Sequence, residues 1–270
     1  MSREETDHAA RLAWLEQAEG AVIAISSDYP DGYRVSEHSH SRAQLLHARS
    51  GVVLVTSAQG RWMVPRGHAM WIPAHVRHAV EMIGDVRMHS VYVASEGQDG
   101  LPSGLRVLGL TDLMRSLIAE AVTLPSDTSP EGRAALILAL LVAEIPNLDE
   151  QPLALPFPSD ERLAVLCRRF VEAPSAHVTI DAWAKKAGMS RRSLTRHFAE
   201  ETGLGLSTWR RQALLFAALP RLAAGEPVTR VALDLGYESV PAFTTMFRRF
   251  LGAAPRAWLR GGEVGKQPSL

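Results

Sequence analysis

The pattern of apolar residues changes once along this chain of 270 residues, and that change limits the folds that the chain can adopt. From about residue 21 to 94, short β-rich runs alternate with turn residues. This spacing predicts an antiparallel sandwich or barrel. Beyond residue 159 the pattern is helical. The sequence therefore predicts an α+β protein of two domains, each with its own core.

A proline-rich stretch separates the two patterns. DEQPLALPFPSD, at 149–160, holds three prolines, which cannot continue a helix and favour extended backbone. We therefore expect four parts along the chain: a β domain with helices over 1–148, a linker over 149–158, an all-α domain over 159–261 and a flexible tail over 262–270.

The two halves carry opposite charge, although the whole chain is neutral. Residues 1–158 hold 12 Lys and Arg against 19 Asp and Glu, whereas residues 159–270 hold 17 against 10. A basic half suggests binding to a polyanion. The single cysteine, Cys167, excludes an intramolecular disulfide. Because we find neither a signal-peptide pattern nor eighteen consecutive apolar residues, we expect a cytoplasmic protein that does not bind membranes.

Two helical stretches follow the β-rich runs. In TDLMRSLIAEAV, at 111–122, the apolar residues form one stripe and Thr111 is placed to cap the helix. EGRAALILALLVAEI, at 131–145, is apolar on most of its circumference. Because this second helix follows a barrel rather than filling one, we expect it to form the contact of a homodimer.

The basic half contains one pattern twice: a helix, a glycine turn and a second helix. The first copy lies at 178–203 with its turn at Gly188, and the second lies at 228–252 with its turn at Gly236. This is the arrangement of a helix-turn-helix. The second helix of the first copy, capped by Ser190, exposes one face that carries Arg191, Arg192, Thr195 and Arg196. Such a face suits a DNA major groove, and the alternative is an ordinary solvated helix face.

Two longer motifs extend this pattern. They read A-x-x-x-G-M-S-x-x-x-L-x-R-x-F-x-x-E-T-G at 184–203 and A-L-D-L-G-Y-E-S-x-x-x-F-x-x-x-F-R-R-F-L-G-x-x-P at 232–255. Over about residues 160–260 the chain thereby resembles the AraC/XylS family of transcription regulators. In that family the two second helices enter adjacent major grooves. The resemblance implies base reading by Arg192, Thr195 and Arg196 of the first copy.

The second copy departs from the family pattern at the corresponding positions. Family members commonly carry long polar side chains there, whereas this chain carries short or apolar ones: Val240, Pro241, Thr244 and Thr245. This departure puts base reading by the second copy in doubt. We expect Arg248 and Arg249 to hold DNA phosphates, which position a protein without specifying sequence.

The stretch EHSHSRAQ, at 37–44, raises the question of a metal site. On a continuous strand, His38, His40 and Gln44 would share one face. The β-rich half also resembles the cupin superfamily. Its first motif, G-x5-H-x-H-x3-E-x6-G, is matched with Gln44 in place of glutamate. Its second, G-x5-P-x-G-x2-H-x3-N, is matched in part by Gly67, Pro73 and His78.

The cupin resemblance implies a barrel in which His38, His40 and His78 converge on one divalent metal ion, with Gln44 as a weak fourth ligand. The alternative is a pocket of neutral, hydrogen-bonded histidines without metal. His68 and His89 are expected on the β surface. We also expect an apolar effector pocket, with plain barrel core as the alternative, lined by Trp62, Trp71, Met82 and Tyr92.

These features predict a sequence-specific DNA-binding transcriptional regulator, either activator or repressor, that responds to a small molecule or a metal. Its implied partners are double-stranded promoter DNA, RNA polymerase, the effector and a second copy of the chain. The alternative is a metal-dependent cupin enzyme of the dioxygenase or isomerase type. The missing carboxylate ligand and a whole domain devoted to DNA argue against that alternative, so we expect no enzyme activity. The sequence leaves the operator and the effector open.

Overall fold

The computed structural model describes residues 10, 12–94, 100–124 and 132–259, so the predicted tail at 262–270 lies outside the described residues. The chain forms two compact units, which comprise 1–58 with 62–154 and 59–61 with 155–270. The division falls inside the stretch predicted as a linker. Within that stretch a short strand forms, β10 (Ala154–Pro156).

Two five-stranded sheets are built mostly from strands of the first unit. One has the order β1 (Val22–Tyr29), β8 (Val86–Val93), β3 (Ala43–Ala48), β6 (His68–Ile72), β9 (Arg106–Gly109). The other has the order β10, β5 (Gly60–Pro65), β4 (Val52–Ser57), β7 (His78–Ile83), β2 (Arg34–His38). The registered strand pairs are antiparallel, which confirms the fold class predicted for this half.

The first sheet presents two different faces. Gln44 on β3 lies opposite Tyr92 on β8, whereas the next residue, Leu45, lies opposite Val91 and Trp71. Because successive side chains of a strand point to opposite faces, Gln44 and Tyr92 share one face and Leu45 and Trp71 share the other. The Leu45 face packs against two helices in one apolar core. The Gln44 face therefore points away from that core.

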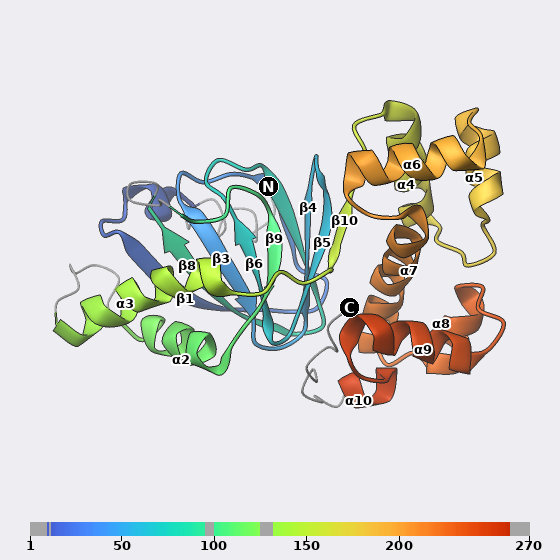
Figure 1. Cartoon of the computed structure of the whole chain (residues 1–270). Coiled ribbons are helices and arrows are strands. Elements are labelled where there is room, and N and C mark those ends of the chain that lie inside the picture. The colour runs from blue at the N-terminus through green and yellow to red at the C-terminus, as the bar shows by residue number, and fades with distance from the viewer. Residues whose placement is uncertain (1–9, 11, 95–99, 125–131, 260–270) are drawn as a thin grey trace. The chain divides into compact units, whose positions relative to one another are not determined.

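The covering helices are α2 (Asp112–Ala121) and α3 (Gly132–Glu144) (Figure 1). A short 3₁₀ helix, η1 (Ile145–Asn147), follows α3. The cap predicted for α2 is confirmed, because Thr111 Oγ1 accepts from the backbone N–H of Met114 at 3.1 Å. On α3 one side is buried by Ile137, Leu138 and Leu141. The opposite side leaves Leu136 72% and Leu140 43% exposed, so this helix keeps an uncovered apolar strip.

The second unit is helical, as predicted. Its helices are α4 (Glu161–Glu172), α5 (Ile180–Ala187), α6 (Arg191–Thr202), α7 (Leu206–Ala223), α8 (Val228–Asp234), α9 (Val240–Leu251) and α10 (Pro255–Leu259). Within this unit α7 runs from the group α4–α6 to the group α8–α10 (Figure 1). The long helix therefore sets the separation of the two helix-turn-helix copies.

Aromatic side chains hold α7 to the first group. The ring of Trp209 on α7 lies 6.2 Å from Phe170, 6.0 Å from Trp183 and 5.9 Å from Phe198, measured between centroids. The indole N–H of Trp209 donates to the carbonyl of Pro156 at 2.7 Å, so the one polar atom of this buried ring is satisfied. Among the described residues, no helix combines the length and the apolar composition that crossing a membrane requires.

Candidate metal centre and nucleic-acid interface

The three histidines predicted as metal ligands lie together in the first unit. His38 ends β2 and pairs across the sheet with His78, the first residue of β7. The ring centroid of His78 lies 4.3 Å from that of His38 and 5.3 Å from that of His40. One nitrogen of each ring lies within 4.8 Å of the others, the one group of this kind found in the described part of the chain.

His38 and His40 do not lie on one continuous strand, although the sequence predicted that they would. β2 ends at His38 and β3 begins at Ala43, so His40 lies in the connecting loop rather than on a continuous strand. The register of β2 against β7 also shifts between Val35 and His38. The prediction of a shared strand face was therefore wrong, because the two-residue period ends where the strand ends. The loop turns His40 toward the other two rings instead.

Each of the three rings is oriented by a backbone carbonyl. The Nδ1 atom lies 2.9 Å from the Ser36 oxygen in His38, 2.5 Å from the Arg42 oxygen in His40 and 2.8 Å from the Val76 oxygen in His78. A carbonyl can only accept, so in each neutral ring Nδ1 carries the proton and Nε2 carries the lone pair. This is the arrangement in which a protein orients a histidine to ligate a metal through Nε2.

The side chain of Gln44 lies against one of these ligand atoms. Its amide contacts Nε2 of His40 at 3.2 Å, the hydroxyl of Ser90 at 2.9 Å and the hydroxyl of Tyr92 at 3.2 Å. Since Nδ1 of His40 donates to Arg42, Nε2 must accept. The structure places Oε1 of Gln44 toward His40 and its N–H₂ toward the two hydroxyls. Because two acceptors would then face each other, we assign the reversed amide, whose N–H₂ donates to Nε2 of His40 and whose oxygen accepts from the hydroxyls. In this arrangement Gln44 competes with a metal for His40.

Burial favours the neutral form of His38 and His40. The pKa of His38 and the pKa of His40 are both lowered, chiefly because burial disfavours the charged ring. Neutral imidazole is the form that binds metals. The three nitrogen donors, their fixed tautomers and their burial therefore fit a divalent transition metal.

The predicted effector-pocket residues do not form one group. Tyr92 lies beside Gln44 and His40, whereas Met82 shares a face of β7 with His78 but lies four residues further along the strand. Trp62 is buried on β5. Trp71 was predicted wrongly, because it lies on the other face of its sheet, within the core formed with α2 and α3. Its indole N–H donates to the Pro102 carbonyl at 2.7 Å.

His68 and His89, expected on the surface, are buried instead, with 6% and 5% of their surface exposed. His89 shares the face of β8 that α2 and α3 cover, and its ring centroid lies 6.3 Å from that of His47. Burial lowers the pKa of His47 to about 4, and its Nδ1 lies 2.9 Å from the carbonyl oxygen of His68. These three rings are therefore neutral structural residues at neutral pH.

The first helix-turn-helix has the predicted local geometry. α5 ends at Gly188, which has a positive φ of 66°, and α6 is capped by Ser190, whose hydroxyl accepts from the Ser193 N–H. Trp183 and Ala184 on α5, with Leu194 and Phe198 on α6, are buried. Both cap and turn confirm the sequence prediction. The second helix of the copy is thereby held with one face inward and one face free.

That free face carries the predicted base-reading residues. Arg192 and Arg196 are exposed, and Arg196 lies 3.7 Å from the carboxylate of Glu200. Arg191 pairs with Asp181 of α5 at 3.2 Å. Thr195 is half-buried and its hydroxyl donates to the carbonyl of Arg191, so its methyl group is what remains for a base. Arg192 and Arg196 are thus the two long side chains best placed to reach a groove.

In the turn of the second helix-turn-helix, the backbone of Gly236 lies close to the side chain of His177. Gly236 has a φ of +80°, and a Cβ there would lie 2.8 Å from the ring of His177, so only glycine fits. α9 is capped by Ser239 and buries Phe243, Met246, Phe247 and Leu251. Of the six predicted DNA contacts on this helix, four are exposed and two half-buried. The exposed ones are Pro241, Thr245, Arg248 and Arg249, and the half-buried ones are Val240 and Thr244.

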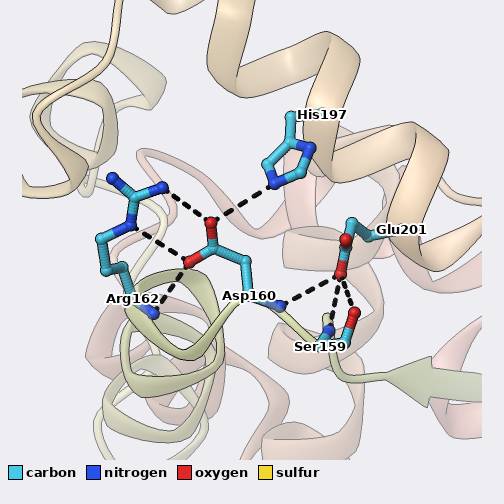
Figure 2. A network of polar contacts seen from close by, with 5 residues as sticks. All are labelled: Ser159, Asp160, Arg162, His197 and Glu201. Atoms are coloured by element: carbon cyan, nitrogen blue, oxygen red, sulfur yellow. Dashed lines mark hydrogen bonds and ion pairs between the residues drawn. The ribbon is translucent and has the colours of Figure 1, made fainter.

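A polar network that the sequence did not suggest joins the start of α4 to α6 (Figure 2). Asp160 accepts from Arg162 at 2.8 Å and lies 3.4 Å from Nε2 of His197. Glu201 accepts from the backbone N–H groups of Ser159 at 2.7 Å and of Asp160 at 3.1 Å. The residues that follow the predicted linker are therefore tied directly to the first reading helix.

Comparisons with known proteins agree with this two-part organisation. Residues 19–141 match the AraC-like ligand binding domain, and residues 183–261 match a helix-turn-helix domain. The HTH-type transcriptional regulator NimR of Escherichia coli (strain K12) is 30% identical over 222 residues, which cover 82% of this chain and 81% of NimR.

Two further relatives are regulatory proteins, one similar over most of this chain and one over a smaller part of it. The HTH-type transcriptional activator RhaR of Enterobacter sp. (strain 638) is 23% identical over 88% of this chain and 92% of its own length. The regulatory protein SoxS of Escherichia coli (strain K12) is 38% identical over 79 residues, 29% of this chain and 74% of SoxS. The likeness to NimR spans both units, and each unit matches a domain of the same kind of regulator. This chain therefore belongs to the AraC family of transcriptional regulators, with a ligand-binding and a DNA-binding domain.

Proposed function

We propose that this regulator changes its activity at promoter DNA when the cluster of His38, His40 and His78 binds a divalent metal ion. The observation that carries the proposal is the convergence of the three rings, which brings one nitrogen of each within 4.8 Å of the others. Each Nδ1 is engaged by a backbone carbonyl, so in each ring Nε2 is the atom that would ligate a metal. His47 and His68 also place Nδ1 beside a backbone carbonyl, so the convergence of three rings, rather than their tautomer, distinguishes this cluster.

The metal would be bound reversibly and as a signal. Gln44 occupies the position where the cupin motif has glutamate, and a neutral amide holds a divalent cation less tightly than a carboxylate does. Gln44 also contacts Nε2 of His40, so metal binding must displace that contact. The displaced amide would move its partners Ser90 and Tyr92 on β8. An ion that alters this network as it binds is suited to signalling.

This arrangement also supports a regulator without enzyme activity. The groups that contact the cluster are an amide and two hydroxyls, together with backbone carbonyls. None of them is a general base at neutral pH. The carboxylate of Glu16, whose charge acts on His40, is engaged by the backbone N–H of Ser41. With a weak metal site, the cluster is poorly equipped for oxygenase or isomerase chemistry.

The regulator would act as a homodimer on promoter DNA together with RNA polymerase. Support for the dimer comes from α3, whose Leu136 and Leu140 form an exposed apolar strip, and from Leu113 of α2, which is also exposed. A protein that regulates a promoter works in the compartment that holds the chromosome, which in bacteria is the cytoplasm. Whether it activates or represses depends on where the operator lies relative to the promoter.

The experiment has two readouts: metal content and operator binding. Purified protein, dialysed against Zn²⁺, Ni²⁺ or Co²⁺, should take up at most one ion per chain. An operator is first found by selection from genomic DNA. Its affinity is then measured by fluorescence anisotropy with and without the ion.

The matched variants are a His38→Ala/His40→Ala double variant and His75→Asn as control. His75 is exposed on a neighbouring loop with a positive φ of 64°, which asparagine tolerates. The double variant should lose the ion, remain folded and bind the operator without responding to metal. The control should behave like the unaltered chain. A double variant whose response to metal is unchanged would refute the proposal.

A further inference from the structure

A pocket of about 420 Å³ lies inside the DNA-binding unit, between α7 and α9. Its polar lining comes from three places: Ser207, Arg210 and Arg211 on α7, Tyr237 at the turn before α9, and Thr245 and Arg249 on α9. The lining contains three arginines and no carboxylate. The arginines of α7 lie between the two helix-turn-helix motifs and belong to neither.

The three guanidinium groups of this arginine pocket lack anionic partners. Within the described ranges, none of them lies within 4.0 Å of a carboxylate oxygen. The same helix shows the contrast, because Arg221 on α7 pairs with both Glu226 and Asp234. On α7, therefore, two carboxylates neutralise Arg221. The described residues place no carboxylate against the three arginines of the pocket.

Two contacts fix the position of the Arg210 guanidinium group. Its guanidinium donates to the carbonyl of Val178 and lies over the ring of Phe170, 5.6 Å from the centroid. Its Nε is buried and has no hydrogen-bond partner among the residues that the structure describes. An arginine stays charged even when burial lowers its pKa. The partly buried cation of Arg210 and the exposed cations of Arg211 and Arg249 line one pocket, and this arrangement favours the binding of an anion.

The position of the pocket identifies the anion. Thr245 and Arg249 are one turn apart on α9, and both are exposed on the face where the sequence predicts DNA contacts. We propose that the arginine pocket binds a phosphate group of the DNA backbone beside the groove that α9 enters. This inference rests on the proposed binding to promoter DNA and deepens it.

This assignment explains the unusual surface of α9. Val240, Pro241, Thr244 and Thr245 cannot reach far into a groove. A helix that carries such residues contributes little direct readout, but it can still fix the position of the protein if a phosphate is held firmly beside it. The second helix-turn-helix would then anchor the regulator, and the first would read sequence.

The same chemistry could serve a free phosphate-bearing small molecule, since the pocket volume lies within the range of small-ligand sites. The experiment distinguishes the two sources. Its variants are Arg211→Gln and Arg249→Gln, both exposed pocket residues, with Arg168→Gln as control. Arg168 is exposed on α4, outside the pocket, and its substitution removes the same charge. Arg210 is left intact because it also supports the fold.

The first arm measures binding to operator and to random duplex DNA over a range of salt concentrations. Each pocket variant should weaken binding to both duplexes by the same factor, on the order of tenfold. Each should also reduce the slope of log affinity against log salt by about 1. The control should change neither quantity, and all variants should keep the unfolding temperature of the unaltered chain.

The second arm uses inorganic phosphate as the probe, with chloride at matched ionic strength. If a free phosphate-bearing molecule is the occupant, phosphate raises the unfolding temperature of the unaltered chain but not of Arg211→Gln, while DNA affinity is unchanged in both variants. That result keeps the anion site and overturns the DNA assignment. Unchanged DNA binding with no effect of phosphate overturns the pocket altogether. Failure of the unaltered chain to bind any duplex would instead refute the proposed promoter binding.

Discussion

The carboxylate of Asp160 caps α4 and also lies 3.4 Å from Nε2 of His197, on the helix that we expect to read DNA. Asp160 lies two residues after the predicted linker, directly before α4. A change in the path of the linker would therefore act on α6 through this contact and through the neighbouring contact of Glu201 (Figure 2).

Substituting Asp160 should show how much the cap contributes. Asp160→Ala should lower the free energy of unfolding of the helical unit by about 0.5–2 kcal/mol, because the N–H of Arg162 loses its acceptor. Asp160→Asn should cost clearly less, because asparagine also caps helices well. Urea unfolding measures the change, and hydrogen exchange over α4 assigns it to this unit. Equal losses in the two variants would show that charge rather than capping matters at this position.

The Glu201 carboxylate should make stability depend on pH in acid. Hydrogen bonds from Ser159 and from the Asp160 backbone lower its pKa in the folded state. The unfolded chain therefore binds a proton at a higher pH, and the stabilisation is present above the ordinary glutamate pKa and is lost as pH falls through the lowered one. Glu201→Gln should be less stable at pH 7, and its deficit should shrink as the pH falls below 4. A deficit that stays constant from pH 7 to pH 3 would contradict this account.

The first reading helix should distinguish operator from random DNA. Arg192→Ala and Arg196→Ala should each cost about 1–3 kcal/mol of binding to the operator and much less of binding to random duplex, because a base contact exists only at the correct site. Arg249→Ala should weaken binding to both duplexes alike. Anisotropy titrations at one fixed salt concentration measure all three. If the three variants lose affinity equally on both DNAs, the separation into reading and anchoring copies is wrong.

Restoring the missing carboxylate should strengthen the metal site. In Gln44→Glu the new oxygen can face the three histidines and keep hydrogen bonds from Ser90 and Tyr92. We expect divalent metal affinity to rise on the order of tenfold or more. Competition with a chelating dye measures the change, and Gln44→Leu, which removes both amide functions, serves as control. Tighter binding in the leucine variant than in the glutamate variant would show that Gln44 acts only by blocking His40.

The apolar strip on α3 should mediate self-association. A Leu136→Glu/Leu140→Glu double variant places two charges on the exposed side of the helix and leaves the buried Ile137, Leu138 and Leu141 untouched. Sedimentation at micromolar concentration should find the unaltered chain dimeric and the double variant monomeric. An Ala139→Glu variant tests whether any exposed charge on this helix has the same effect. A double variant that remains dimeric would place the interface elsewhere.

Local signals in the sequence determined much of this protein. Thr111 and Ser190 cap their helices through bonds to residues three positions away, and Gly188 turns the chain where no side chain is tolerated easily. These features depend on neighbours within one helical turn, so they can be predicted without a fold. The two helix-turn-helix copies, and with them the family, follow from the same short-range pattern.

The tertiary structure alone decided which distant groups meet. His38 and His78 are 40 positions apart and pair only because β2 lies beside β7, and His40 joins them through a loop rather than by strand period. Trp71 and His89 are buried because two helices cover one face of a sheet, and periodicity shows that two faces exist but not which one is covered. The contact of Asp160 with His197 depends, in the same way, on packing between helices. Side-chain spacing is a property of the backbone conformation, whereas the partner of each face is selected by the burial energy of the whole unit.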